Sequence, residues 1–394
     1  MIFDFIISGL GPSGAFLSYE LSKMGYNVLA LEKNKLPRYK ACGGGLTPKI
    51  LNVLPFSINE LIENHTDTIG FSYKMKEKVL IKAKAPFCYT VMRKDFDHFL
   101  ACKASNAGSK INECEKLINF SEKKELIEVE TDKCRYKTQY LIGADGATSL
   151  IAKKSRLAEK KRFYLTLTAE IHMPEHAFNE NRSISWGDFG GVERGYAWIL
   201  PKKNHSTLGV GNFYVSNKKI KHIRNMILNY TENYSLLKNA VIHGPIRGHY
   251  IPTLIDNKSL IARGNIFLVG DAAGLVDPFT GEGIYYALRS SQILAKLFSK
   301  HKDINDIQNE YHRIVSEEII SEFKIADKIA KLVYGFPGYA HRLLKKYNYL
   351  GDYYLNVLSG HTSYANTYER LTYRIKSMFL EKSLGLFSGL IKQK

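Results

Sequence analysis

Residues 2–32, IFDFIISGLGPSGAFLSYELSKMGYNVLALE, predict a strand, a glycine turn, a helix and a second strand. The run from Ile2 to Ser8 is apolar and β-branched, as in a buried parallel strand. A helical pattern extends from Ala15 to Met24, Gly25 ends it, and residues 27–31 return as a strand. Three glycines at the G-x-G-x-x-G spacing separate the first strand from the helix: Gly9, Gly11 and Gly14. The stretch therefore predicts the first β-α-β unit of an α/β domain.

The residue types and spacing of this turn are typical of a turn that binds a dinucleotide. Gly9 allows the tight turn, Gly11 lets the backbone approach a pyrophosphate, and Gly14 lets the helix lie close to the strand. Ser13 stands at the helix N-terminus, where free N–H groups bind phosphate. Glu32 follows eighteen positions beyond Gly14 and can accept hydrogen bonds from ribose hydroxyls, which favours FAD or NAD over NADP. The alternative is a glycine-rich turn in an α/β domain that binds no nucleotide.

The composition indicates a large globular protein with a strong positive charge. At 394 residues the chain can bury a core of two or three structural units. No apolar run is long enough to span a bilayer, and the N-terminus enters the first strand without a leader, so we predict a cytoplasmic protein. The net charge of +18 favours nucleic acid, an acidic substrate or an anionic membrane as partner, and a lysine-rich surface without such a partner is the alternative.

The cysteine pattern indicates neither a disulfide framework nor a zinc site, and no metal site is predicted. The number of cysteines is odd, no C-x-x-C pair occurs, and the last 260 residues contain none. The five positions are Cys42, Cys88, Cys102, Cys114 and Cys134.

A glycine-rich loop, KACGGGLTPKIL at residues 40–51, follows the first unit. Its three consecutive glycines cannot fill a core with side chains, so we expect their backbone to lie close to a ligand, with a helix starting near Thr47. A flavin is the natural candidate, and Cys42 would then lie beside its isoalloxazine ring. A small filler residue is the alternative for Cys42. The three glycines are Gly43, Gly44 and Gly45.

Two further segments carry candidate contacts. The helix predicted over residues 94–107 has Arg93 near its start and Asp97 inside it, for which the residues alone favour a solvated helix face. A buried strand ends in YLIG and runs into a turn with Asp145 and Gly146, at the edge where open α/β sheets bind ligands. Asp145 is either a turn-forming residue or a cofactor contact.

Residues 266–298, IFLVGDAAGLVDPFTGEGIYYALRSSQILAKLF, return to the nucleotide domain. A buried strand precedes Asp271, and Gly281 and Gly283 open a helix that runs to about Leu297. The free N–H groups of that helix would face the edge of a flavin where negative charge develops on reduction.

Between these segments the sequence alternates as in an antiparallel sheet. Strands are predicted over residues 163–250, with a helical stretch near 218–230, and also over 66–92. The segment GYAWILPK at 195–202 carries a compact aromatic cluster, for which cross-strand pairing is the alternative to a ligand site.

The last quarter of the chain, residues 300–394, is predicted to be helical, with breaks at residues 335–338 and at Gly351. Its end, YRIKSMFLEKSLGLFSGLIKQK at 373–394, mixes large apolar residues with lysines. A core or dimer helix is one interpretation, and a helix on an anionic membrane surface is the other.

Three pieces from distant parts of the chain, GLGPSG with Glu32, LIGADGATS and VGDAAGLVDPFTGEG, together resemble the FAD-binding pattern of the p-hydroxybenzoate hydroxylase-like flavoproteins. The resemblance covers essentially the whole nucleotide domain and implies FAD as the cofactor. It places Glu32 at the adenosine ribose, Arg93 against the FAD, and Asp145 near the pyrophosphate. Asp271 would bind the ribityl or pyrophosphate side, and the backbone of Gly281 to Gly283 would face the flavin ring.

Within that superfamily, KACGGGL and GYAWILPK are similar to the geranylgeranyl reductase family, which carries a K-x-C-G-G-G-L type loop and a Y-x-W-x-F-P-K strand. GVGN at residues 209–212 also matches that family. Leu200 departs from the usual Phe. Ile151 and Ala152 stand in the region where hydroxylases commonly carry an Arg, which disfavours a hydroxylase.

The resemblance implies that reduced FAD saturates isolated C=C bonds of a prenyl chain in a lipid, a quinone or a related isoprenoid. Such an alkene has no carbonyl to polarise it, so the protein must supply alignment, a dry pocket and a proton. Cys42, or a water that it positions, is the predicted proton donor. The predicted substrate contacts are Tyr196, Trp198, Pro201 and Gly209.

The predicted fold is α/β, with a Rossmann-like FAD-binding domain, an antiparallel-sheet substrate domain and a C-terminal helical region. We assign residues 1–65, 90–160 and 255–300 to the FAD-binding domain, 66–89 and 161–254 to the substrate domain, and 301–394 to the helical region.

The predicted partners are a prenylated substrate, an electron donor and an anionic membrane surface. The donor stays open between ferredoxin, NAD(P)H and a quinol, and the charge with the final helix predicts peripheral attachment to the inner face of a membrane. Nucleic acid is not predicted, because the basic residues are diffuse and no nucleic-acid-binding motif occurs.

Two alternative functions stay open. One is a flavin monooxygenase or halogenase on the same fold, since GYAWILP resembles the W-x-W-x-I-P of flavin halogenases, although Tyr196 replaces their first Trp and Leu200 their Ile. The other is a basic flavoprotein without catalysis, which carries electrons or binds nucleic acid.

Overall fold

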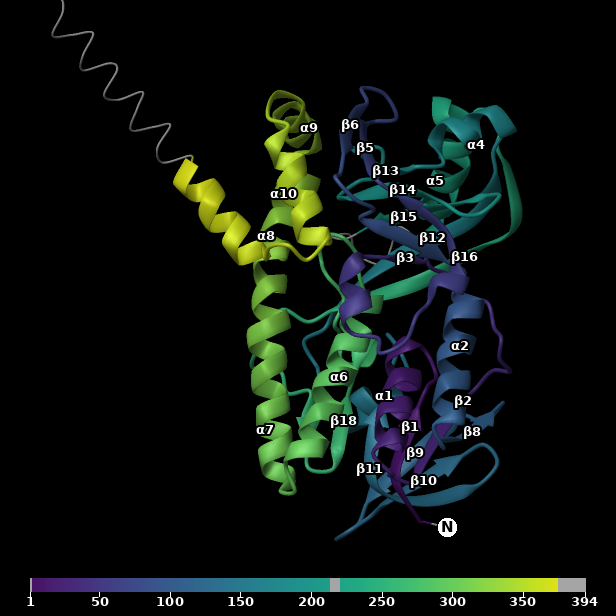
Figure 1. Cartoon of the computed structure of the whole chain (residues 1–394), viewed down its shortest axis with the longest axis vertical. Coiled ribbons are helices and arrows are strands. Elements are labelled where there is room, and N and C mark those ends of the chain that lie inside the picture. The colour runs from purple at the N-terminus through teal and green to yellow at the C-terminus, as the bar shows by residue number, and fades with distance from the viewer. Residues whose placement is uncertain (1, 213–219, 375–394) are drawn as a thin grey trace, which may run out of the picture.

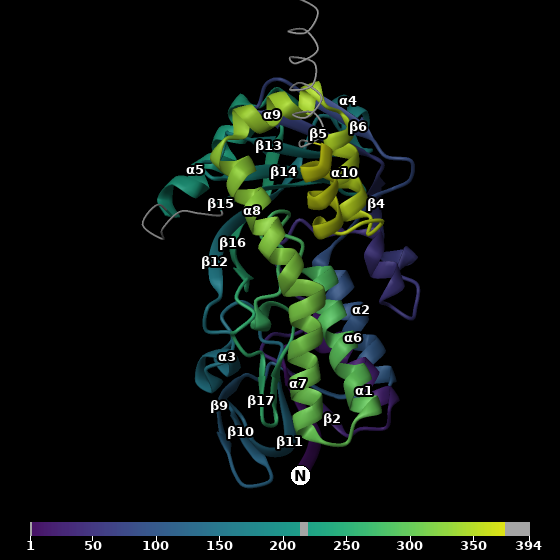
Figure 2. The same cartoon turned by 90° about the vertical axis from the view of Figure 1, so that its left-hand side faces the viewer.

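The computed structural model describes residues 2–212 and 220–374. One sheet with its helices lies near the N-terminal end of the molecule, a second sheet lies at the opposite end, and helices from the last part of the chain run along one side of both (Figures 1 and 2). The predicted α/β fold is confirmed, with a sheet of parallel strands, a largely antiparallel sheet and C-terminal helices. The predicted division into domains stays a prediction.

The first sheet has eight strands, with β17-β18-β11-β1-β2-β8 in order and β10 and β9 attached to β11. Its centre is parallel, because β1 pairs in parallel with both β11 and β2. Of the residues that predicted a buried strand at the start of the chain, Phe5, Ile6 and Ile7 are fully buried, whereas Ile2 at the beginning of the strand is exposed. The strands are β1 Ile2–Ser8, β2 Val28–Glu32, β8 Lys110–Glu113, β9 Leu117–Glu122, β10 Ile127–Thr131, β11 Arg135–Gly143, β17 Ala262–Arg263 and β18 Ile266–Leu268.

Helices cover this sheet and bring their N-termini to the carboxyl ends of its strands. Helix α1 packs against both α2 and α6. Helix α1 begins at Pro12, three residues before the predicted start, because proline is favoured in the first turn of a helix. The helices are α1 Pro12–Lys23, α2 Arg93–Asn106, α3 Leu150–Ser155 and α6 Ile284–Lys300.

The second sheet has seven strands in the order β16-β12-β15-β14-β13-β5-β6. It is antiparallel except at one pair, because β13 runs parallel to β5, a strand from a distant part of the sequence. Helix α5 packs against one face through Ile227 and Tyr230, which lie in a cluster with Leu208 and Val210. The elements are β5 Thr68–Tyr73, β6 Val79–Lys82, β12 Arg162–His172, α4 Glu175–Asn181, β13 Ile184–Phe189, β14 Gly195–Pro201, β15 Ser206–Asn212, α5 Ile220–Asn233 and β16 Val241–Thr253.

A small third sheet holds the glycine-rich loop in place. Its order is β3-β7-β4, with β3 Gly45–Leu46, β4 Ile62–Thr66 and β7 Cys88–Val91. The strand at residues 88–91 was expected in the second sheet and lies here instead, because it pairs with the loop strand β3 on one edge and β4 on the other. A short 3-10 helix, Pro48–Asn52, follows β3 where a helix start was predicted.

The C-terminal helices are α7 Ile304–Val315, a π-helical turn at Ser316–Ile320, α8 Ser321–Gly335, α9 Pro337–Lys346 and α10 Tyr349–Leu358. The predicted break at residues 335–338 is present between α8 and α9. The predicted break at Gly351 is wrong, since Gly351 lies inside α10. A Cβ atom there would lie 1.8 Å from Ile81 Cδ1, so this glycine allows α10 to approach β6. The predicted membrane helix at 373–394 falls almost entirely outside the described residues. None of the described helices combines the length and the hydrophobicity of a membrane-spanning segment.

Candidate functional site

A cavity of about 270 Å³ lies where the two large sheets meet the C-terminal helices. One part of its wall is backbone and charge, from the glycine turn of β1 and α1, the loop at residues 40–45 and the start of α6. The other part is aromatic and aliphatic, from the second sheet and from α8 and α10. The cavity therefore has one region suited to a polar cofactor and one suited to an apolar substrate.

The glycine turn packs as the sequence predicts. Gly9 has φ +98°, and a Cβ atom on it would lie 2.4 Å from Ala144 O. A Cβ on Gly14 would lie 1.9 Å from Gly9 O, so only glycine lets α1 lie this close to β1. Gly11 has open space around its Cα, and with Ser13 it lines the cavity. No side chain caps the N-terminus of α1, which leaves its N–H groups for an anionic ligand.

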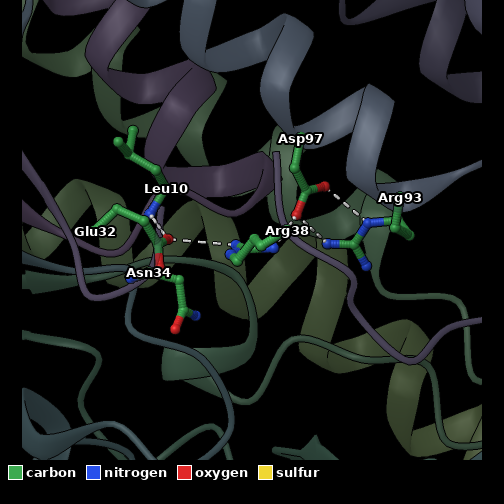
Figure 3. A network of polar contacts seen from close by, with 6 residues as sticks. All are labelled: Leu10, Glu32, Asn34, Arg38, Arg93 and Asp97. Atoms are coloured by element: carbon green, nitrogen blue, oxygen red, sulfur yellow. Dashed lines mark hydrogen bonds and ion pairs between the residues drawn. The ribbon is translucent and has the colours of Figure 1, made fainter. Parts of the chain in front are cut away.

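Glu32 ends β2 beside this turn, and its carboxylate organises the nearby backbone (Figure 3). Leu10 N donates to Glu32 Oε2 at 3.1 Å, and Asn34 N donates to Oε1 at 3.1 Å. Arg38 Nη2 lies 3.4 Å from Oε2. Glu32 does not line the described cavity, so its predicted contact with a ribose stays a prediction.

Arg38 joins Glu32 to the pair Arg93 and Asp97 (Figure 3). Arg38 Nη1 donates to Asp97 Oδ2 at 2.9 Å, while Arg93 donates from Nε to Oδ1 at 2.8 Å and from Nη2 to Oδ2 at 2.9 Å. Burial opposes the charge of Asp97, but Arg93 and Arg38 lower its pKa below the usual value. The carboxylate thus holds two guanidinium groups in fixed directions.

The solvated helix face proposed for Arg93 and Asp97 is wrong. Asp97 is fully buried and Arg93 is nearly so, because the first turn of α2 faces the loop that carries Arg38. Arg93 lines the cavity, as expected of a cofactor contact. Arg38 was not predicted, since nothing in its local sequence distinguishes it from a surface arginine.

The loop at residues 42–45 forms one wall of the cavity and is held by a buried lysine. Lys202 Nζ donates to Gly43 O at 2.6 Å and to Val91 O at 3.1 Å, and the side chain is 1% exposed. Burial lowers the pKa of Lys202. Gly44 adopts φ +66°, and its N–H donates to Cys42 Sγ at 3.3 Å. Cys42 lines the cavity with both glycines.

Asp145 acts as a turn-forming residue. Its Oδ2 accepts hydrogen bonds from Leu150 N at 2.8 Å and Ile151 N at 3.4 Å, which fixes the start of α3. Burial raises its pKa, and Oδ1 is buried without a hydrogen-bond partner in the described structure. Gly146 lines the cavity but Asp145 does not, so a contact of Asp145 with the cofactor stays a prediction.

Asp271 lies on the cavity wall next to two residues that were not predicted. His249 Nε2 is 3.6 Å from Asp271 Oδ2, and Lys40 also lines the cavity. Burial would raise the pKa of Asp271, but His249 and the positive charge of Lys40 lower it to about 2. Lys40 could have been predicted as a site residue, because it belongs to the loop motif at residues 40–46. Nothing in the sequence around His249, on β16, indicates a site.

The turn before α6 exposes backbone to the cavity. Gly281 has φ +74°, and no side chain caps α6 at Gly283. Asp277 holds the turn, because its Oδ1 accepts from Phe279 N at 2.7 Å and from Thr280 N at 3.0 Å. Tyr196 OH donates to Thr280 O at 2.5 Å, so the second sheet and this turn are joined directly.

Of the predicted substrate contacts, two line the cavity and two do not. Alternate residues of β14 face it, Tyr196, Trp198 and Leu200, as the period of a strand requires. Pro201 faces the other side of the sheet. Gly209 lies behind Trp198, and a Cβ atom there would lie 2.1 Å from the indole ring.

The C-terminal helices complete the apolar part of the cavity. Tyr334 of α8 and Tyr354 and Leu358 of α10 line it. Tyr334 OH also donates to Phe279 O, and Tyr364 OH donates to Asp277 Oδ2 at 2.8 Å. These residues were not predicted, because their helical pattern alone does not tell which helix faces a site.

The residues present fit FAD. Two uncapped helix N-termini, glycines whose backbone faces the cavity, and the buried Arg93 provide donors for a pyrophosphate and a flavin edge. Among the described residues no group of His, Cys, Asp and Glu is arranged to hold a metal ion.

Comparisons with known proteins agree with this geometry. Residues 3–183 match a family described as an FAD binding domain. The chain is 32% identical to an uncharacterized protein of Methanosarcina barkeri over 97% of this chain and 96% of that protein. It is 29% identical to the digeranylgeranylglycerophospholipid reductase of Methanococcus vannielii over 78% of this chain and 80% of that protein. The chain belongs to the FAD-dependent geranylgeranyl reductase family.

Solved structures place this family member in a wider fold group. A geranylgeranyl bacteriochlorophyll reductase-like protein of Thermoplasma acidophilum has a TM-score of 0.72 at 19% identity, over 84% of this chain and 88% of that chain. A flavin-dependent brominase has a TM-score of 0.74 at 18% identity, over 95% of this chain and 100% of that chain. These likenesses show that the reductase family and the flavin halogenases share the fold. The cofactor of the family member is FAD.

Proposed function

We propose that this flavoprotein saturates isolated C=C bonds of a prenyl chain in a membrane lipid, acting on CH–CH groups. The observation that carries the proposal is that the apolar part of the cavity opens directly onto its glycine-lined part. A relative at 29% identity is named for the reduction of a digeranylgeranylglycerophospholipid, which makes a lipid with two such chains the first substrate to test. When bound, reduced FAD supplies the hydride.

The residues of the chain would align the alkene and keep water away. Tyr196 and Trp198 from β14, with Tyr334 and Tyr354 from the C-terminal helices, give flat apolar walls on which a prenyl chain can lie. Burial raises the pKa of Tyr196 above its range in water, so its hydroxyl stays protonated and keeps donating to Thr280 O. This bond joins the substrate wall to the turn at Gly281, and it fixes the distance between the two.

A proton must reach the second alkene carbon, and we assign its delivery to Cys42 or to a water that Cys42 positions. Cys42 lines the cavity beside Gly43 and Gly44. Its sulfur accepts the Gly44 N–H at 3.3 Å, which holds the side chain at this place in the cavity wall.

Substitution of Cys42 by serine tests the assignment. Reduced enzyme is mixed anaerobically with substrate, and the return of oxidised-flavin absorbance is followed. We expect Cys42→Ser to slow this return by at least about a hundredfold, the lower end of the range for losing an acid catalyst. Cys88→Ser is the matched control, because Cys88 lines the same cavity. A normal rate in Cys42→Ser removes Cys42 from this role.

The proposed function is tested by the same anaerobic mixing with unmodified enzyme. Rapid return of flavin absorbance with a digeranylgeranylglycerophospholipid, and none with its fully saturated analogue, supports reduction of the alkene. A response to neither lipid contradicts it. Oxygen consumption coupled to an aromatic substrate would instead favour the halogenase-type alternative, for which the likeness to a brominase gives only the fold.

We further propose that the protein works in the cytoplasm, attached peripherally to the inner face of the membrane, and receives electrons from a ferredoxin, NAD(P)H or a quinol. The net charge of +18 supports attachment to anionic lipid.

A further inference from the structure

Three large apolar side chains are exposed near the junction where α8 ends and α9 begins. Leu332 is 60% exposed, Phe336 is 64% exposed, and Tyr339 is 56% exposed. They are close along the backbone, since Phe336 N donates to Leu332 O and Tyr339 N donates to Phe336 O. We call residues 328–346 the α8–α9 corner. It is located at the end of the molecule that is far from the N-terminus (Figure 2).

Exposed basic residues lie before and after these apolar residues in the sequence. The sequence from residue 328 to 346 contains no acidic residue. Two of the exposed basic residues have acidic neighbours, as Lys331 Nζ lies 2.7 Å from Asp327 Oδ2 and Lys345 Nζ lies 3.7 Å from Glu77 Oε2. The corner keeps a positive surplus. Its exposed basic residues are Lys328, Lys331, Arg342, Lys345 and Lys346.

The opposite face of the same helix forms part of the cavity. Successive residues of an α-helix are turned by about 100°, so residues two apart point in nearly opposite directions. Tyr334 is buried and lines the cavity, whereas Leu332, two residues before it in α8, and Phe336, just past the end of α8, are exposed. Helix α8 therefore stands between the apolar part of the cavity and the exposed apolar group.

We propose that the α8–α9 corner docks the protein on an anionic phospholipid bilayer. Exposed apolar side chains with basic residues around them match a surface that is apolar below a layer of negative charge. A second copy of this chain is a poor occupant, because a two-fold interface would bring two basic rims together. The inference rests on the proposed function for its purpose, since it brings a lipid substrate next to the helix that lines the cavity.

The charge gives an expected size for the effect. A basic residue near an anionic membrane contributes about 1 kcal/mol, which corresponds to about a fivefold change in affinity. Reversing two of the basic residues should weaken binding by more than about twentyfold. Salt should weaken it as well, since exposed charges are screened.

The test uses full-length, FAD-loaded protein and sedimentation with vesicles. One set of vesicles is phosphatidylcholine alone, and the other is phosphatidylcholine mixed with phosphatidylglycerol. The apolar variant is Leu332→Ser with Phe336→Ser, and its control is Leu260→Ser, which changes a residue 49% exposed outside the corner. The charge variant is Arg342→Glu with Lys346→Glu. Its control is Lys123→Glu with Lys124→Glu, which makes the same net change on the exposed turn between β9 and β10.

We expect salt-sensitive binding to the mixed vesicles only, lost in both corner variants and kept in both controls. The proposal is overturned if the unmodified protein ignores the mixed vesicles or binds phosphatidylcholine equally well. It is also overturned if the corner variants bind as the unmodified protein does, or if they change the oligomeric state without vesicles, which would indicate a second copy as occupant. If the apolar variant fails to fold, the charge variant decides. All variants keep residues 375–394, so a loss in the corner variants is not due to that segment.

Reduction of a prenylated lipid separates this proposal from the proposed function. With lipid dispersed in detergent, the corner variants should reduce it at the normal rate, and with lipid in anionic vesicles they should reduce it several-fold more slowly. If the unmodified protein binds the vesicles but reduces lipid in neither form, the proposed function fails while the docking surface stands.

Discussion

Trp198 lies between two glycines, and one of them, Gly209, leaves the space that its ring occupies. It pairs with Gly187 of β13 on one side and with Gly209 of β15 on the other. A Cβ atom at Gly209 would lie 2.1 Å from the indole ring, whereas one at Gly187 would meet its nearest atoms only at 3.8 Å. The ring therefore lies over Gly209. Gly209 does not line the cavity, but it sets the position of Trp198, which does.

We predict that Gly209→Ala pushes the indole ring out of its place in the cavity wall. The folded protein should lose about 1–3 kcal/mol, as expected for an overpacked site. Turnover of a prenyl substrate should fall further than stability explains. Gly187→Ala is the matched control and should change neither the stability nor the turnover by much. Denaturant unfolding and steady-state reduction measure the two effects, and equal losses in both variants would contradict this account of Gly209.

Lys161 gives a pH-dependent contribution to stability. Its Nζ donates to Ala272 O at 2.7 Å, and burial lowers its pKa from 10.5 to about 8. Below about pH 8 the amine is charged in both states, and burial of the charge opposes folding in full. Between about pH 8 and 10.5 the folded state loses the proton first while the unfolded state keeps it, so this opposition fades as the pH rises.

The free energy of unfolding of the wild type should therefore rise relative to that of Lys161→Met between pH 8 and 10.5. The relative rise is at most about 1.4 kcal/mol per pH unit. Denaturant melts at several pH values measure it. The neighbouring Lys160→Met is the control, because Lys160 is 68% exposed and should not give this trend. A flat or falling difference for Lys161→Met would show that the ammonium is not opposed by burial.

At the scale of elements, the position of α10 depends on one close contact with strand β6. Gly351 packs against Ile81 of β6, where a Cβ atom would lie only 1.8 Å from Ile81 Cδ1. This contact fixes the helix whose Tyr354 and Leu358 line the cavity. Gly335 at the end of α8 has no atom within 4 Å of such a Cβ position.

We predict that Gly351→Ala loosens α10 from the second sheet. Amide hydrogen exchange over residues 349–358 should become faster, and prenyl turnover should fall, while FAD stays bound at the other part of the cavity. Gly335→Ala should leave exchange over the same residues unchanged. Unaltered exchange in Gly351→Ala would mean that the helix is not held by this contact.

The sequence predicted those elements whose signals are local. The turn at Gly9 to Gly14 was predictable because the strand, the glycines and helix α1 are consecutive in the sequence, and α6 was predictable because Gly281 and Gly283 directly precede it. The predicted helix break at Gly351 was wrong, because a glycine that ends a helix cannot be distinguished in sequence from one that makes room for a neighbouring side chain. The solvated helix face favoured by the residues alone for Arg93 and Asp97 was wrong, because a loop distant in the sequence buries that turn of the helix.

At the scale of the molecule, the cavity exists because segments far apart in the chain converge. The sequence predicted the glycines and Asp271 that line one part of the cavity, because they carry recognisable spacing, and their contact with FAD stays a prediction. Of the apolar part of the cavity, the sequence singled out only β14, because Tyr334 and Tyr354 come from helices whose role depends on how the C-terminal region packs against the second sheet. His249 and Arg38 were missed for the same reason, as their partners are brought to them by the fold.

At the scale of the molecule we propose that the cavity holds FAD and a prenyl chain together, so that alkene bonds are reduced. Mass spectrometry tests it most directly, on a digeranylgeranylglycerophospholipid incubated with dithionite-reduced, FAD-loaded protein. We predict products heavier by whole multiples of two hydrogen atoms, absent when the protein is left out. A lipid of unchanged mass, from protein shown to hold reduced FAD, would contradict the account.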